Sequence, residues 1–167
     1  MGGQLVRGHL VWLLVLLLAA GPAPAAGAET ERADESTMEI VVAEWAYEVR
    51  DEGDYDPNPS GVFARGTRAY AYLEVEGFAR GADVTQPLVD LRVDVGLRSR
   101  LGIKLFSQED LVEYTMPHGP FPPDRVWFYI WVDIPWWAPR TTYVAEVTVR
   151  DLVAGGSVTL QREITVE

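Results

Sequence analysis

Apolar and polar residues alternate along most of the chain after residue 38, which is the pattern of half-buried β-strands. In residues 69–76, alanine, leucine and valine at odd positions alternate with tyrosine and glutamate at even positions. Residues 89–95 and 143–150 show a similar alternation, with mainly charged side chains or threonine on the second face. Parallel strands are covered on both sides and read as continuous apolar runs, so strands with one hydrophilic face predict antiparallel sheets.

Turn-forming residues divide this alternating region into seven or eight strands. A single helical turn or two over residues 108–114 is the one competing assignment. This number of short strands predicts an all-β fold, an antiparallel β-sandwich. The expected strands cover residues 38–50, 67–77, 87–97, 101–106, 110–115, 125–134, 141–151 and 157–166.

The N-terminal 28 residues have the order of a secretory signal peptide: one cation, an apolar run, then small residues and prolines. The run is about half of the roughly 20 apolar residues that span a bilayer, which favours cleavage over a permanent anchor. We therefore expect a signal peptide at 1–28, a short disordered lead at 29–37 and a sandwich domain at 38–167. The mature protein is expected to be exported, to a periplasm or to the extracellular space.

Charge narrows the choice of partners. The predicted signal peptide carries Arg7 and no acid, so the remaining chain keeps 13 of the 14 basic side chains against 25 acidic ones, a net charge of −12. This balance argues against nucleic acid and, after signal cleavage, against membrane surfaces as partners. The chain has no cysteine, so an exported domain of this sequence must be stabilised by burial without disulfides.

Two stretches resemble immunoglobulin-like modules of exported bacterial proteins. Residues 139–143 read PRTTY and lead through VAEVTV into Asp151, a turn and a closing strand, which resembles the last two strands of such modules. Phe63-Ala64-Arg65-Gly66 before the strand at 67–77 resembles an early strand. Arg140 stands where these modules usually have glycine. The resemblance implies an immunoglobulin-like fold and, by analogy, an accessory or binding role.

Little in the sequence indicates catalysis. After residue 28 the chain has one histidine, His118, in a proline-rich loop, and it has neither an HExxH motif nor a cysteine cluster to build a zinc site. Ser157 follows two glycines but lacks the trailing glycine of a nucleophile elbow. The 25 acidic residues leave open a carboxylate pair of the kind that glycosidases use. We expect no enzymatic activity and no cofactor, with a carboxylate-dependent hydrolase as the remote alternative.

One acidic loop carries oxygen side chains at alternate positions, namely Asp54, Asp56 and Asn58. Calcium takes six to eight oxygen ligands from such loops. However, Pro59 occupies the place where a calcium loop needs a sharply turning glycine, and no glutamate closes the loop. These residues are the candidate metal ligands, and the expectation is a solvated loop that binds calcium poorly or not at all.

The most unusual stretch is the strand at 125–134, RVWFYIWVDI, because neither of its faces is polar. Its alternation places Val126, Phe128 and Ile130 on one side. The other side carries a ridge of Trp127, Tyr129 and Trp131, which we call the aromatic ridge. Three exposed aromatics would equal or exceed the largest apolar patch of an ordinary monomer, roughly 300–600 Å². The ridge therefore needs cover.

Three kinds of cover are open: the chain's own segment 107–124, a protein partner, or a carbohydrate stacked on the rings. Trp136 and Trp137 follow Pro135 at a loop tip and are expected to be the better candidates for direct contact with a ligand. The sequence thus predicts an exported, non-catalytic interaction or accessory module. Its expected partner is a protein, and the alternative is a carbohydrate-binding module that uses the aromatic ridge to bind a polysaccharide.

The mature protein is predicted to begin at Glu29, because Ala26-Gly27-Ala28 places small residues at the offsets that signal peptidase requires. Mass analysis of the exported protein checks this. An intact Met1 in a membrane fraction would contradict it.

Overall fold

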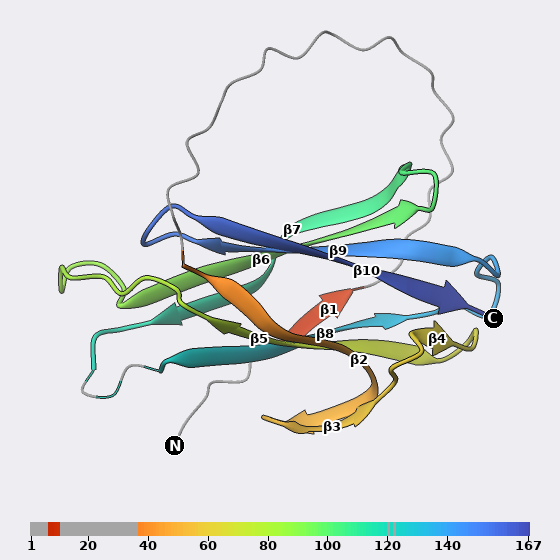
Figure 1. The fold of residues 1–167 in the computed structure, drawn as a ribbon, viewed down its shortest axis with the longest axis horizontal. Helices are drawn as coiled ribbons and strands as arrows, with labels where there is room; N and C mark the ends of the chain where they lie inside the picture. Colours follow the sequence, from red (N-terminus) through yellow and green to blue (C-terminus); the bar gives the residue numbers. More distant parts are fainter. Residues whose placement is uncertain (1–6, 11–36, 120, 122) are drawn as a thin grey trace, which may run out of the picture.

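The chain folds into two mostly antiparallel β-sheets that pack face to face, seen edge-on in Figure 1. The computed structural model describes residues 7–10, 37–119, 121 and 123–167. These residues form strands and connecting loops and contain no helix. Accordingly, this part of the chain contains no helix long and apolar enough to cross a membrane.

Each sheet contains five strands. The first has the order β1-β8-β5-β2-β3, and the second has the order β4-β10-β9-β6-β7. Neighbouring strands are antiparallel except for the pairs β1–β8 and β4–β10, which are parallel. The strand bounds are β1 Arg7–Leu10, β2 Glu39–Asp51, β3 Asp54–Pro57, β4 Val62–Phe63, β5 Arg68–Glu76, β6 Val89–Ser99, β7 Lys104–Met116, β8 Arg125–Asp133, β9 Thr142–Asp151 and β10 Ser157–Val166.

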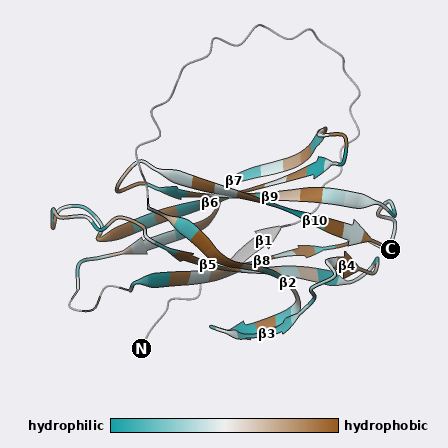
Figure 2. Cartoon of the chain, viewed as in Figure 1, coloured by the Kyte–Doolittle hydropathy of each residue, from teal (hydrophilic) through white to brown (hydrophobic). Residues whose placement is uncertain are grey.

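The main hydrophobic core lies between the two sheets. Leu73 and Val75 of β5 and Phe128 of β8 meet Leu91 and Val93 of β6 there, and all five are buried. The alternation of apolar and polar positions places these side chains inward, and Figure 2 shows brown and teal segments alternating along the strands. A second cluster, which includes Phe63, Leu97, Ile134 and Ile164, continues the core toward one end of the sheets.

The all-β class and the mainly antiparallel pairing are confirmed, and each expected strand overlaps one that forms. The ranges 101–106 and 110–115, however, belong to one strand, β7. Val93 pairs with Val112 and Val95 pairs with Gln108, so the residues between them form a bulge. This extra length breaks the period of two, which is why the sequence suggested two strands. The helical assignment for 108–114 is wrong.

Three short strands, β1, β3 and β4, were not expected from the sequence. They contain four, four and two residues, too few to show a clear alternation. β1 lies within the predicted signal peptide and pairs with β8 from Arg7↔Tyr129 to Leu10↔Val132. The remainder of the predicted signal peptide and of the lead, except Thr37, lies outside the described residues. A chain that begins at Glu29 lacks β1 and leaves β8 at the edge of its sheet.

One buried carboxylate joins the β9–β10 turn to the loop after β5. Asp151 is 1% exposed and accepts hydrogen bonds from the backbone amides of Val153, at 2.9 Å, and Ala154, at 3.2 Å. It also accepts one from the amide of Ala79, at 2.6 Å. Three backbone donors thus satisfy this carboxylate, which gives a physical role to the aspartate in the immunoglobulin-like pattern.

Asp151→Ala is predicted to destabilise the fold by about 3 kcal/mol, because it leaves three partly buried backbone donors without their charged acceptor. Denaturant unfolding measures the loss. The control is Asp124→Ala, which removes a side chain that is 95% exposed and paired with Arg80, and which should change the free energy of unfolding by about 0.5 kcal/mol or less. Equal losses in the two variants would contradict this role for Asp151.

Candidate functional site

The aromatic ridge is buried. Trp127, Tyr129 and Trp131 are between 5% and 7% exposed and belong to a cluster on the outer face of the first sheet, away from the main core. Tyr72 of β5 stacks on Trp127, with ring centroids 6.0 Å apart. Tyr55 of β3 stacks on Tyr72 at 4.3 Å, so the unexpected strand β3 brings a further ring to this face. The ridge is therefore not an open stacking platform.

The cover expected from segment 107–124 is wrong. Residues 107–116 lie in β7, which belongs to the second sheet. Val112 is buried in the main core, and Leu111, Tyr114 and Met116 pack against that core and not against the ridge. Phe121 is exposed. The sequence pattern did not reveal this because it identifies the two faces of a strand but not the sheet to which the strand belongs.

The outer face of β5 was expected to be hydrophilic, but Tyr72 and Glu74 are buried there. The Tyr72 hydroxyl donates to Glu74 Oε1 at 2.7 Å and accepts from the Gly53 amide at 2.9 Å. Burial and then the hydrogen bond to Glu74 raise the pKa of the Tyr72 phenol, so it stays protonated as a donor. Arg125 pairs with the same Glu74 carboxylate. These partners allow a carboxylate to lie beside an aromatic cluster.

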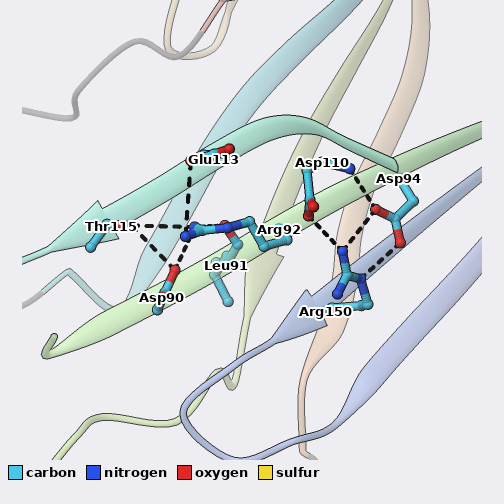
Figure 3. A network of polar contacts seen from close by, with 8 residues as sticks. All are labelled: Asp90, Leu91, Arg92, Asp94, Asp110, Glu113, Thr115 and Arg150. Carbon is cyan, nitrogen blue, oxygen red and sulfur yellow. Dashed lines mark hydrogen bonds and ion pairs between the residues drawn. The ribbon is translucent and has the colours of Figure 1, made fainter. Parts of the chain in front are cut away.

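The outer face of the second sheet carries charged side chains that form ion pairs with one another (Figure 3). Arg150 donates to both carboxylate oxygens of Asp94, at 2.8 and 3.1 Å, and to Asp110 Oδ1 at 2.6 Å. Asp110 lies in the β7 bulge with φ of 51°, and its amide donates to Asp94 Oδ1 at 2.8 Å. Burial favours the neutral form of Asp94, but these hydrogen bonds outweigh burial and lower its pKa. The network holds the bulge in place.

Two of the three candidate calcium ligands, Asp54 and Asn58, already have other partners. Asp54 accepts from Arg50 at 2.6 Å, and this hydrogen bond lowers the pKa of Asp54. Asn58 is buried, and its side-chain amide donates to the Val62 carbonyl at 2.8 Å. Asp56 lies opposite Glu48 in the β2–β3 pairing. Within the described ranges, no group of three or more histidine, cysteine, aspartate or glutamate side chains is placed to hold a metal.

Trp136 and Trp137 lie in the turn after β8 and are 77% and 44% exposed. Ile134 and Ala138 on either side of them are buried in the end cluster, and the Ala138 amide donates to the Pro135 carbonyl at 3.0 Å. This turn is thus anchored at both ends while its two indoles face outward. Of the five predicted contact residues, these two are exposed to a ligand.

The β6–β7 hairpin brings further apolar side chains to the same end of the sheets. Ser99 of β6 pairs with Tyr143 near the start of β9, so the hairpin tip and the β8–β9 loop lie on neighbouring strands (Figure 1). Leu101 is 88% exposed and Ile103 is 61% exposed. We call the three loops 64–67, 100–103 and 134–141 the loop end. The sequence did not identify the hairpin tip as part of the site, because its residues fall partly in a predicted turn and partly at the start of a predicted strand. A signal was present: in RLGIKL, residues 100–105, leucine and isoleucine alternate with arginine, glycine and lysine.

An open groove lies beside the loop end on the first sheet, with Tyr47, Tyr70, Arg68, Asp133 and Ile134 among its lining residues. Arg68 donates to both oxygens of Asp133, at 2.7 and 3.1 Å, and lies 5.2 Å from the ring centroid of Trp131. Tyr47 is exposed and contacts Phe63 edge-on. The groove therefore combines an exposed aromatic ring with a planar ion pair.

Comparison with known proteins shows similarity of fold only. No protein-family model and no curated protein matches the chain. The C-terminal domain of Wzt aligns at a TM-score of 0.50 with 9% identity, over 80% of this chain and 75% of that chain. The DNA glycosylase AlkC of Pseudomonas fluorescens aligns at 0.42 with 16% identity, over 64% of this chain, which spans only 27% of AlkC. An immunoglobulin-like protein of Pseudomonas aeruginosa aligns at 0.37 with 11% identity, over 78% of this chain and 96% of that one.

Trp127→Ala and Trp131→Ala are each predicted to lower the free energy of unfolding by about 3–5 kcal/mol, because each leaves a cavity in a packed aromatic cluster. Trp136→Ala and Trp137→Ala remove exposed rings and should cost about 0.5 kcal/mol. Denaturant melts of the four single variants measure these differences. Wild-type stability of the Trp127 and Trp131 variants would show that the ridge is not buried.

The stabilising effect of Asp94 is predicted to depend on pH. Its pKa is lowered in the folded state, so its contribution is fully present above the unfolded-state pKa of about 3.9 and is lost as the pH falls through the folded-state value. The stability difference between the wild type and Asp94→Asn should therefore be constant from pH 7 to about 5 and narrow below about pH 4. Urea melts across this range measure the difference, with Glu109→Gln as the surface control. A difference that widens toward low pH would contradict the assignment.

Proposed function

We propose that this chain is an exported immunoglobulin-like β-sandwich that acts as a non-catalytic interaction module and contacts its partner through the loop end. The observation that carries the proposal is the exposure of Trp136 and Trp137 on an anchored turn. Tryptophan is among the residues that contribute most to binding energy at interfaces. Loops at the end of a rigid two-sheet framework are also the usual place for binding residues.

The charge arrangement supports a non-catalytic role. Hydrolysis by a carboxylate pair needs one carboxyl group with a raised pKa to act as the general acid. In the described ranges, the four carboxyl groups with a shifted pKa are Asp54, Asp83, Asp94 and Glu146, and each is shifted downward by hydrogen bonds. Asp94 and Asp110 both accept hydrogen bonds from the Arg150 guanidinium. The hydrogen bonds to Asp94 lower its pKa and favour its ionised form, which is the opposite of what a general acid needs.

The alternative function is carbohydrate binding, and one observation favours it. The groove beside Tyr47 offers an exposed ring next to the Arg68–Asp133 pair, and sugars are bound by stacking on rings and by hydrogen bonds to planar polar groups. In this alternative the site is the groove instead of the aromatic ridge. Loss of polysaccharide binding in Tyr47→Ala, with binding retained in Trp136→Ala, would favour it over contact through the loop end.

A photo-crosslinking amino acid at position 136 tests the proposed function in the cells that export the protein. Benzoylphenylalanine inserts into C–H bonds of proteins, glycans and lipids alike, so the test does not presuppose the partner's class. We expect a covalent adduct from position 136. The matched control is position 84, where Val84 is 80% exposed in a loop at the opposite end of the sheets. Equal adduct yields at 84 and 136, or none at 136, would contradict the proposal.

A further inference from the structure

We propose that the loop end docks onto an anionic lipid surface. This inference rests on the proposed function and names the partner of the same surface. Three features of the loop end carry it: a cationic charge that differs from the rest of the chain, an aliphatic hairpin tip, and a pair of exposed indoles.

Charge is distributed unevenly between the two ends of the molecule. The loops 64–67, 100–103 and 134–141 contain Arg65, Arg100 and Arg140 and no carboxylate, although the chain as a whole has 25 acidic and 14 basic residues. At the opposite end, the loops 77–88, 117–124 and 152–156 contain one arginine and two aspartates. The net charge of the chain therefore does not describe the loop end.

Two of the acids beside the loop end are paired with arginine. Asp133, at the end of β8, forms a bidentate ion pair with Arg68. Glu163 lies 3.6 Å from Arg100, and both of these side chains are 63% exposed, so this pair is held weakly.

A third acid, Glu167, is exposed and lies next to loop 64–67, where its backbone carbonyl accepts from the Arg65 amide at 3.0 Å. Lys104, at the start of β7, adds a further exposed cation beside the hairpin tip. Arg65, Arg140 and Lys104 form no ion pair with a described residue, and these cations suit an anionic partner.

The hairpin tip is rigid and presents its aliphatic side chains to solvent. The Gly102 amide donates to the Ser99 carbonyl, and the Ser99 amide donates to the Ile103 carbonyl, each at 2.9 Å. Gly102 has φ of 81°, a conformation that glycine adopts without strain. Leu101 and Ile103 project from this closed turn between Arg100 and Lys104. Apolar side chains flanked by cations are the arrangement with which protein segments enter the boundary between headgroups and acyl chains.

Trp136 and Trp137 complete the surface. Tryptophan is enriched at the level of lipid headgroups, where an apolar ring and a polar N–H are both accommodated. The two indoles lie on the β8–β9 loop, which leads into the strand that pairs with β6, and Arg140 follows them in the same loop. Exposed aliphatic and indole tips bordered by Arg100, Lys104 and Arg140 therefore match the apolar and anionic layers of a lipid surface.

Because the chain has no native cysteine, single labelled positions can test this inference. The fluorophore NBD is attached at Leu101→Cys, with Val84→Cys at the opposite end as the matched control. Both full-length proteins are mixed with vesicles of phosphatidylglycerol and phosphatidylcholine or of phosphatidylcholine alone. Both carry the same N-terminal segment, so any difference between them reports the loop end.

With anionic vesicles, we expect the label at position 101 to shift to the blue and to be quenched by doxyl-labelled lipid, while the label at position 84 remains unchanged. The double variant Arg100→Gln, Lys104→Gln should weaken partitioning by roughly twenty-fivefold, because each cation near an anionic surface contributes about a factor of five. The double variant Leu101→Ser, Ile103→Ser should abolish insertion of the loop that carries Trp136.

Three results would overturn the inference: no response at position 101, an equal response at positions 101 and 84, or an equal response to neutral vesicles. If position 101 is silent while a crosslinker at 136 captures a protein, the lipid assignment fails and the interaction-module proposal stands. If neither position responds to any partner, both fail.

Discussion

The fold depends on the need to cover both faces of β8. One face, with Val126, Phe128 and Ile130, is buried between the sheets in the ordinary way. The other carries the aromatic ridge, and each of its rings buries roughly 150–250 Å² when covered. A chain without disulfides depends on that burial for its stability. The ring stacks from Trp127 through Tyr72 to Tyr55 cover part of the aromatic ridge. β3 pairs with β2 and so brings Tyr55 over this face of the sheet. Glu74 is buried beside the same rings and therefore needs Tyr72 and Arg125 as polar partners.

Much of this arrangement could be predicted from the alternation of residues. The period of two located the long strands, their antiparallel pairing and the two apolar faces of β8. It could not show that residues 107–116 belong to the second sheet, because local alternation contains no information about strand order. Nor could it show that Tyr72 and Glu74 are buried, since their cover comes from a strand of four residues and from Arg125. The bulge of β7 opposite Asp94 was read as a gap between two strands for the same local reason.

The candidate site was predicted in part. Trp136 and Trp137 were placed at a loop tip because Pro135 precedes them, and both are exposed there. Leu101 and Ile103 were not recognised, since their proximity to the indoles arises from the pairing of β6 with β9. Charge illustrates the same limit. The net charge of the whole chain argued against an anionic surface as a partner. The arginines of the three loops come together at one end only when the strands assemble. A rigid two-sheet framework thus divides its aromatic residues between an internal cluster and an external contact surface.

The division of the tryptophans between these two environments is the central claim, and fluorine NMR tests it most directly. The protein is labelled with 5-fluorotryptophan, its resonances are assigned by single Trp→Phe substitutions, and a soluble gadolinium chelate is added. The structure predicts strong broadening of the Trp136 and Trp137 resonances and little change for Trp127 and Trp131, which are 5% and 7% exposed. Broadening of the Trp127 and Trp131 resonances to the same extent as that of Trp136 would contradict the account.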